Sequence, residues 1–225
     1  MAQESRQVKR TIAFSTKRSG EVHYVLTAAD FLDLARAVEY EGPPKLGVAW
    51  TLIQRFAYLY PVYPTLSKFV KAYSQPVNPR WFPSGVEHTA YYAMLRSKGD
   101  EAGAQRENIE AANRVVKASA PLSALHKDTF QAIDTVFTQH YSPIPKSLHF
   151  HAPDLHRTQD VFAKNKGLDV VTYGTGVRQN WFFGIANTTV SVIATLEDSA
   201  AIGSALIALG YIGGILYLIK RLYAQ

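Results

Sequence analysis

Apolar residues recur at helical spacing near the start of the chain, between Thr27 and Gly42. Thr27 and Asp30 have the spacing of a capping box, and Gly42 supplies a C-terminal stop. The apolar positions between them lie at i, i+3, i+4 and i+7: Phe31, Leu34, Ala35 and Val38. This pattern predicts an amphipathic helix.

The same helical spacing returns along the next hundred residues. Pro61 ends a strongly apolar stretch, and Thr65 is placed to cap the one that follows. Residues 74–85 contain three prolines, so we expect no regular structure there. We predict further helices over residues 48–57, 66–73, 86–97, 102–118 and 128–140.

Alternating β-branched and aromatic residues replace this spacing in the last third of the chain. They predict strands that form a small sheet, over residues 148–152, 169–173 and 177–183. Near the N-terminus, the β-prone runs 11–15 and 22–27 flank a turn and predict a hairpin. The expected fold class is therefore α+β and predominantly α.

Residues 199–219 form a stretch of 21 residues without a charge. As a helix they would extend about 30 Å, which matches the hydrocarbon core of a bilayer. We therefore predict one C-terminal transmembrane helix, followed by a basic tail over residues 220–225. Gly210 and Gly214 have the GxxxG spacing that permits self-association of such a helix.

Composition narrows the chemistry. The chain has no cysteine, which excludes disulfides, thiol catalysis and thiolate metal sites. The formal net charge of +6 suits an anionic polymer such as peptidoglycan, nucleic acid or anionic lipid, without choosing among them. The sequence contains neither a phosphate-binding P-loop nor a GxSxG nucleophile element.

Glu41 is the candidate catalytic residue, because it extends the apolar stripe of the first helix. It follows Val38 by three residues and Leu34 by seven, so its carboxyl group should face the core or a cleft. Burial raises the pKa of a carboxyl group, as a general acid near neutral pH requires. Asp33 and Glu39 lie off the stripe and should face water. Periodicity alone favours a simpler alternative, a solvated Glu41 at a frayed helix end.

Helix geometry excludes a catalytic partner for Glu41 from the same helix. Paired glycosidase carboxylates lie about 5–5.5 Å or about 6.5–9.5 Å apart. Glu39 projects about 200° away from Glu41, and Asp33 lies about 12 Å back along the axis. Either one acid acts alone or an acid distant in the sequence completes a pair, with three candidates: Glu87, Asp100 and Asp154.

Several short motifs follow one another in a distinctive order. Leu-Ala-Arg-x4-Glu occupies residues 34–41, and Val-Ala-x5-Arg occupies residues 48–55. Looser matches come later: Pro64-Thr65, Val70, Gln75, Trp81, His149-Phe150-His151 and Trp181-Phe182-Phe183. In this order, residues 30–185 resemble the cell-wall hydrolase family of the spore-cortex-lytic type. With the C-terminal anchor and no apolar secretion signal, we expect a phage-encoded member. Two departures are the short, basic loop after Glu41 and Gln54 in the place of the family's asparagine.

The resemblance implies a lysozyme-like domain of the lytic transglycosylase type that acts on peptidoglycan glycan strands. Glu41 takes the place of the family's catalytic acid. In that mechanism one carboxyl group protonates the glycosidic oxygen and then accepts the proton of the sugar's own 6-hydroxyl group. No second carboxylate and no cofactor is needed. A muramidase outcome, in which water is the acceptor, stays open.

Candidate substrate-binding residues come from two segments. The irregular stretch presents amide and aromatic side chains that suit sugar recognition: Tyr73, Gln75, Asn78 and Trp81. His149 and His151 share one face of a predicted strand and are further candidates. With His156 they also suggest a metal site, but Pro153 interrupts the run, and we predict no metal.

These patterns divide the chain into an N-terminal segment (1–27), a lysozyme-like domain (28–185), a linker (186–198), a transmembrane helix (199–219) and a tail (220–225). We expect peptidoglycan and a lipid bilayer as partners, and no nucleic acid. A membrane anchor without an apolar secretion signal favours a virion component acting in the bacterial envelope. The alternatives are a non-catalytic membrane or virion structural protein and a metal-dependent peptidoglycan peptidase or amidase.

Overall fold

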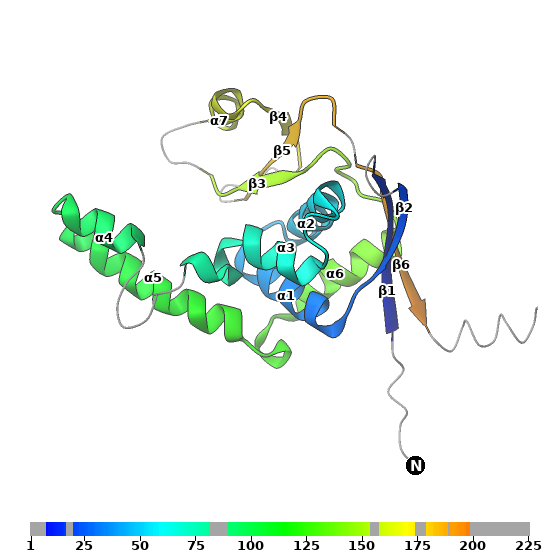
Figure 1. Ribbon diagram of the computed structural model, residues 1–225, viewed down its shortest axis with the longest axis horizontal. Coiled ribbons are helices and arrows are strands. Elements are labelled where there is room, and N and C mark those ends of the chain that lie inside the picture. The colour runs from blue at the N-terminus through cyan, green and yellow to red at the C-terminus, as the bar shows by residue number, and fades with distance from the viewer. Residues whose placement is uncertain are drawn as a thin grey trace, which may run out of the picture.

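Two three-stranded antiparallel sheets lie against a central group of helices (Figure 1). The computed structural model describes residues 8–16, 20–81, 90–153, 158–173, 179–188 and 190–198. The first sheet has the order β2-β1-β6: β2 (Gly20–Val25), β1 (Val8–Thr16) and β6 (Val192–Asp198). The second has the order β3-β5-β4: β3 (His149–His151), β5 (Trp181–Ile185) and β4 (Leu168–Val171).

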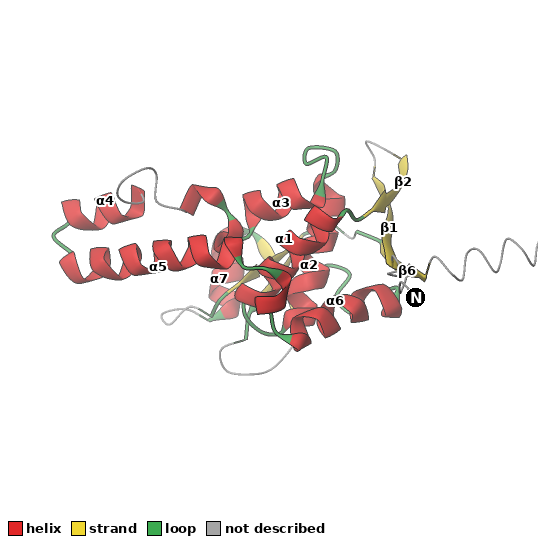
Figure 2. Cartoon of the chain, turned by 90° about the horizontal axis from the view of Figure 1, so that it is seen from below, coloured by secondary structure: helices red, strands yellow, loops and turns green. Residues whose placement is uncertain are grey.

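The helices fall into a central group and a projecting hairpin (Figure 2). The central group comprises α1 (Ala28–Tyr40), α2 (Lys45–Leu59), α3 (Leu66–Tyr73) and α6 (Lys127–Gln139). The hairpin comprises α4 (Ala90–Ser97) and α5 (Glu101–Ser119), and α7 (Gln159–Lys166) precedes β4. Three short 3-10 turns complete the chain: η1 (Gln75–Val77), η2 (Pro79–Trp81) and η3 (Leu122–Ala124).

The predicted helix boundaries around α1 are confirmed. The Thr27 hydroxyl accepts a hydrogen bond from the Asp30 N–H, and the Asp30 carboxylate accepts one from the Thr27 N–H, at 3.1 and 2.9 Å. Glu41 is the C-cap, and Gly42 follows with a φ of +90°, a conformation that favours glycine. This local chemistry fixes the position of Glu41 at the exit of the helix.

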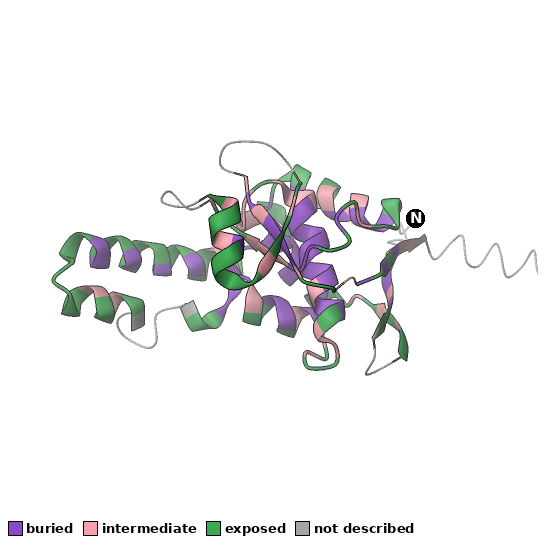
Figure 3. Cartoon of the chain, turned by 90° about the horizontal axis from the view of Figure 1, so that it is seen from above, coloured by how far each residue is buried: buried purple, intermediate pink, exposed green. Residues whose placement is uncertain are grey.

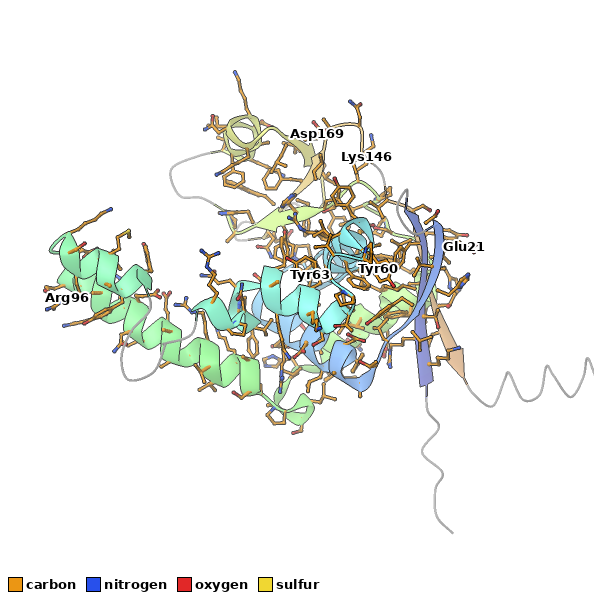
Figure 4. All side chains as sticks on the ribbon, viewed as in Figure 1. Glu21, Tyr60, Tyr63, Arg96, Lys146 and Asp169 are labelled. Carbon is orange, nitrogen blue, oxygen red and sulfur yellow. The ribbon has the colours of Figure 1, made fainter. Side chains whose placement is uncertain are left out.

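Helix α2 forms the centre of the core, since ten of its 15 residues are buried. Figure 3 shows burial concentrated in the central helices, whereas the projecting hairpin is largely exposed. Phe56 packs against Phe14 of β1 and Phe69 of α3. Tyr60 and Tyr63, labelled in Figure 4, extend this aromatic cluster to the edge of the core.

The second sheet reaches α2 at a point where only glycine fits. A Cβ atom added to Gly47 would lie 2.6 Å from the Phe182 ring and 2.7 Å from the Tyr173 ring. In the next turn, the buried Thr51 shares a hydrogen bond of 2.7 Å with Ser147. One turn on, Gln54 donates to the Ser147 carbonyl at 2.7 Å. These contacts attach the segment before β3 and the strand β5 to the helical core.

The stretch expected to be a linker, residues 186–198, contains β6. This strand pairs along the length of β1, with Val8 opposite Asp198 and Phe14 opposite Val192. The N-terminal hairpin and the end of the described chain therefore belong to one sheet. The helix α7 was also not expected from the sequence.

The predicted fold class needs correction, because its transmembrane helix is not found. No helix in the described parts of the chain is long and apolar enough to cross a membrane. The apolar α2 has 15 residues, or about 22 Å. The longer α5 carries six charged residues: Glu101, Arg106, Glu107, Glu110, Arg114 and Lys117. The structure is α+β with two small sheets.

The segment predicted to span the membrane, residues 199–219, lies outside the described residues, as do Gly210 and Gly214. The bilayer contact and the placement in a virion depended on it and stay predictions of the sequence.

The close approach at Gly47 predicts a large effect of one added methyl group. We expect Gly47→Ala to lower the free energy of unfolding by about 1–3 kcal/mol, because the rings of Phe182 and Tyr173 must move. Denaturant unfolding monitored by circular dichroism measures this loss. Ala112→Gly, on the exposed face of α5, is a control that should cost only about 1 kcal/mol of helix propensity. A Gly47→Ala variant as stable as the wild type contradicts this packing.

Candidate functional site

Glu41 lies where the end of α1 meets the start of η1. The Ser74 hydroxyl donates a hydrogen bond of 2.6 Å to Glu41 Oε1. The Asn180 side-chain amide, just before β5, donates to the Glu41 backbone carbonyl at 2.8 Å. Residues from two distant parts of the sequence therefore hold Glu41. Glu41 thus lies beside the segment that follows Tyr73, and its catalytic role stays a prediction.

The environment of Glu41 favours its protonated form. Burial raises the pKa of the carboxyl group to about 6, although the hydrogen bond from Ser74, the N–H of Gln75 and the charge of Lys117 lower it in part. Within the described residues, no carboxylate is among the groups that shift this pKa. Glu41 is thus a single, partly exposed acid that titrates near neutral pH.

The neighbouring carboxylates were expected to face water, and this expectation is wrong. Asp33 is buried, pairs with Arg36 at i+3, and accepts a hydrogen bond of 2.6 Å from the Ser67 hydroxyl. The Glu39 side chain is only 6% exposed. Helical periodicity missed these burials because side chains from other elements cover both flanks of α1.

Glu39 has the opposite electrostatic environment to Glu41. Burial tends to raise the pKa of Glu39, but hydrogen bonds from Thr129, His126 and Lys45 outweigh it and lower the pKa to about 2. Lys45 Nζ lies 3.0 Å from Glu39 and 2.9 Å from Asp128. Two carboxylates two residues apart thus have pKa values shifted in opposite directions from the ordinary value.

Tyr73 connects the surroundings of Glu41 to β3. It ends α3, directly before Ser74, and its ring lies 5.8 Å from Phe150 and 6.2 Å from His149. The guanidinium of Arg55 lies over the Tyr73 ring, 4.3 Å from its centroid. Burial raises the pKa of the Tyr73 phenol, and the charges of Arg55 and Glu41 act on it in opposite directions. Both charges are therefore close to this hydroxyl group.

The other candidate substrate-binding residues from the irregular stretch differ in whether their side chains are free to contact a ligand. Gln75 is exposed at the start of η1. Asn78 is buried, and its amide donates to the Ala72 carbonyl at 2.9 Å while its oxygen accepts from the Arg80 N–H at 2.9 Å. Asn78 thus has a structural environment rather than a free amide. Trp81 ends η2, and its side chain lies outside the described residues.

His149 and His151 lie on β3 and line one pocket of about 370 Å³ between β3, α7, β4 and β5. Phe150, Phe162, Phe183, Leu168 and Lys166 complete the lining. The exposed His151 ring lies 4.5 Å from Phe162. Burial and the charge of Arg55 lower the pKa of His149 to about 4, so this ring is neutral at physiological pH.

The charge next to His149 disfavours the alternative of a metal bound by the histidine run. The Arg55 guanidinium contacts the His149 ring, and a cation there repels a second cation. Asp154 and His156 lie outside the described residues. One other metal-like group occurs in the described chain, Glu39, His126 and Asp128. Lys45 already supplies a positive charge to both of its carboxylates.

The sequence interpretation did not assign site roles to Ser74, Asn180 or Arg55. Arg55 carried a signal, because it is a cation within a strongly apolar stretch of α2. Ser74 and Asn180 carried none, since their roles depend on the meeting of segments far apart in the chain.

The comparisons with known proteins add no relatives. No family model, no curated protein and no solved structure matches the chain. The functional assignment therefore depends on the chemistry of these residues and on the motif order.

The opposite environments of Glu41 and Glu39 predict opposite effects of neutral substitutions. The folded pKa of Glu41 exceeds its ordinary value of 4.5, so its contribution to stability is greatest below pH 4.5 and is lost as the pH rises through 6. Glu41→Gln removes a disfavoured charge and should raise the free energy of unfolding at pH 8 by up to about 2 kcal/mol.

Glu39→Gln is the matched control. Its folded pKa is depressed, so the carboxylate stabilises the fold above pH 4.5, and the variant should be less stable than the wild type at pH 8. Denaturant unfolding of both variants at pH 4 and pH 8 measures these differences. A Glu41→Gln variant whose stability relative to the wild type is lower at pH 8 than at pH 4 contradicts a buried carboxylate with a raised pKa.

Proposed function

We propose that the chain cleaves the glycan backbone of peptidoglycan, with Glu41 as its one catalytic acid. The observation that carries this proposal is a carboxyl group with a pKa near 6, held by Ser74 beside Tyr73. A glycosidic oxygen needs a proton donor to leave, and an acid with a pKa near 6 is still about one-tenth protonated at pH 7, far more than an ordinary glutamate. The motif order shared with cell-wall hydrolases supplies the substrate class.

The proposed reaction uses Glu41 twice. Its protonated carboxyl group donates to the glycosidic oxygen while the bond from that oxygen to C1 of N-acetylmuramic acid breaks. The resulting carboxylate accepts the proton of the sugar's 6-hydroxyl group while O6 bonds to C1 and closes a 1,6-anhydro ring. No water is consumed, and Glu41 ends in its starting protonation state. In a hydrolase, water would take the place of the 6-hydroxyl group.

The surrounding residues suit this cycle. The Ser74 hydroxyl and the N–H of Gln75 are donors to the carboxyl group, so they favour the anionic intermediate without abolishing the raised pKa. The exposed Gln75 and the half-buried Tyr73 present an amide and a ring beside the acid, which suit the N-acetyl group and the face of a sugar.

Substitution of Glu41 tests the catalytic role directly. In a gel containing purified peptidoglycan, the full-length chain should clear the polymer, and Glu41→Gln should lose activity by about 10²- to 10⁴-fold. Glu110→Gln, the same change at an exposed site on α5, should keep it. Mass spectrometry should find anhydro products, which lack one water relative to hydrolysis products.

Full activity in Glu41→Gln contradicts the proposal. Loss of activity only with a chelator favours a metal peptidase, and glycan binding without clearing favours a non-catalytic role.

The pH dependence provides an independent test. Since Glu41 must be protonated at the start, kcat/KM should fall as the pH rises above about 6. Ser74→Ala removes a hydrogen bond that lowers this pKa, so the descending limb should move to higher pH. A limb that stays in place in Ser74→Ala, in a variant that folds normally, assigns the limb to another group.

A further inference from the structure

Arg55 is a cation on a helix whose other inward-facing residues are apolar or neutral. It is half-buried, and its guanidinium donates to the Leu148 carbonyl at 2.9 Å while it contacts the rings of Tyr73 and His149. Its Nε atom is buried without a hydrogen-bond partner. Among the described residues, Arg55 therefore contacts the Leu148 carbonyl group, the ring and hydroxyl group of Tyr73 and the His149 ring, none of which is a carboxylate.

Arg55 also lacks a counter-charge. No carboxylate pairs with it in the part of the chain that the structure describes, and guanidinium stays protonated even where burial lowers its pKa. An uncompensated charge at such a position is costly for folding. Several other cations in the described chain have acidic partners: Arg10 with Asp134, Arg36 with Asp33, Lys45 with Glu39, Lys71 with Asp33 and Arg96 with Glu101.

The pocket beside Arg55 has the same charge asymmetry. His149 contacts Arg55 and also lines the pocket, so the two features are continuous. The lining contains three phenylalanine rings and Lys166, but no acidic residue. The pocket therefore offers apolar walls and a positive edge, which suit a small ligand that combines apolar groups with a carboxylate.

This positive site is connected to the candidate acid through one residue. Tyr73 contacts Arg55, His149 and Phe150, and the next residue, Ser74, donates to Glu41. A ligand that spans this row would place an anionic group at Arg55 and a scissile bond near Glu41.

We propose that Arg55 and the adjoining pocket bind a carboxylate carried by muramic acid while Glu41 acts on its glycosidic bond. This inference rests on the proposed function. Of the two sugars of peptidoglycan, only muramic acid bears a lactyl group. That group is a free carboxylate in strands without peptide, and otherwise carries a peptide with its own carboxylates. The planar guanidinium fork matches a carboxylate in either case.

Binding of the monosaccharides tests the proposal without catalysis. N-acetylmuramic acid should bind the full-length Glu41→Gln chain saturably in an NMR titration, with shifts at His149 and Phe150. N-acetylglucosamine, which lacks the carboxylate, should bind much more weakly. Arg55→Met keeps the apolar stem and should weaken binding of N-acetylmuramic acid by about 10- to 100-fold. Arg55→Lys should give an intermediate loss, because it keeps the charge and loses the fork.

Stability provides a control for folding. Arg55→Met should be at least as stable as the wild type in denaturant unfolding, because it removes an uncompensated charge. If it does not fold, Lys166→Met at the pocket edge provides a second variant, with an expected loss of several-fold in binding. Equal binding of both sugars, or no effect of Arg55→Lys and Lys166→Met, overturns the inference.

Longer ligands distinguish the source of the carboxylate. Peptide-free glycan strands and peptide-bearing muropeptides are titrated in parallel against Glu41→Gln and Glu41→Gln/Arg55→Lys. If Arg55→Lys weakens the binding of peptide-free strands only, Arg55 binds the lactyl carboxylate. If it weakens the binding of muropeptides only, Arg55 binds a peptide carboxylate. An active Glu41→Gln with intact muramic acid binding refutes the catalytic proposal alone. If the wild type cleaves peptidoglycan but substitution of Arg55 leaves ligand binding unchanged, only this inference is refuted.

Discussion

The enclosure of α2 is the constraint on which the rest of the structure depends. Its buried face extends nearly all the way round, so α1, α3, α6 and both sheets must pack against it. The burial of so many apolar side chains on one helix is the main driving force that brings β1 and β6, from opposite ends of the described chain, into one sheet. Two of the polar residues on α2, Thr51 and Gln54, form hydrogen bonds with Ser147 in the segment before β3.

The packing around α2 also determines where the candidate functional side chains lie. The second sheet can approach at Gly47 because no side chain intervenes, and this approach brings Asn180 against the end of α1. Arg55 leaves the core at the other end of the same helix and reaches Tyr73 and His149. An acid with a raised pKa and an uncompensated cation are thus set along one row of contacts, each costly for stability and each suited to a ligand.

Glu41 and Glu39 show that position on a helix does not fix the state of a carboxylate. Both side chains are largely buried, yet one pKa is raised and the other lowered, because only Glu39 meets a lysine as well as hydroxyl and imidazole donors. The difference comes from α6 and the start of α2 on one side and η1 on the other. Burial disfavours a charge, and the number of donors decides whether that penalty is overcome.

The sequence by itself determined the local elements. Caps at Thr27 and Thr65, the stop at Gly42 and the helical stripes predicted most helices closely, because these signals act within a few residues. Alternation in Val190, Val192 and Ala194 was also present for β6, but it gave no indication that β1 would be its partner. Only the tertiary structure decided which polar groups meet: Ser74 at Glu41, Thr129 at Glu39 and, among the described residues, no acid at Arg55. Such pairings join residues tens of positions apart, and their energies exist only once the core around α2 has closed.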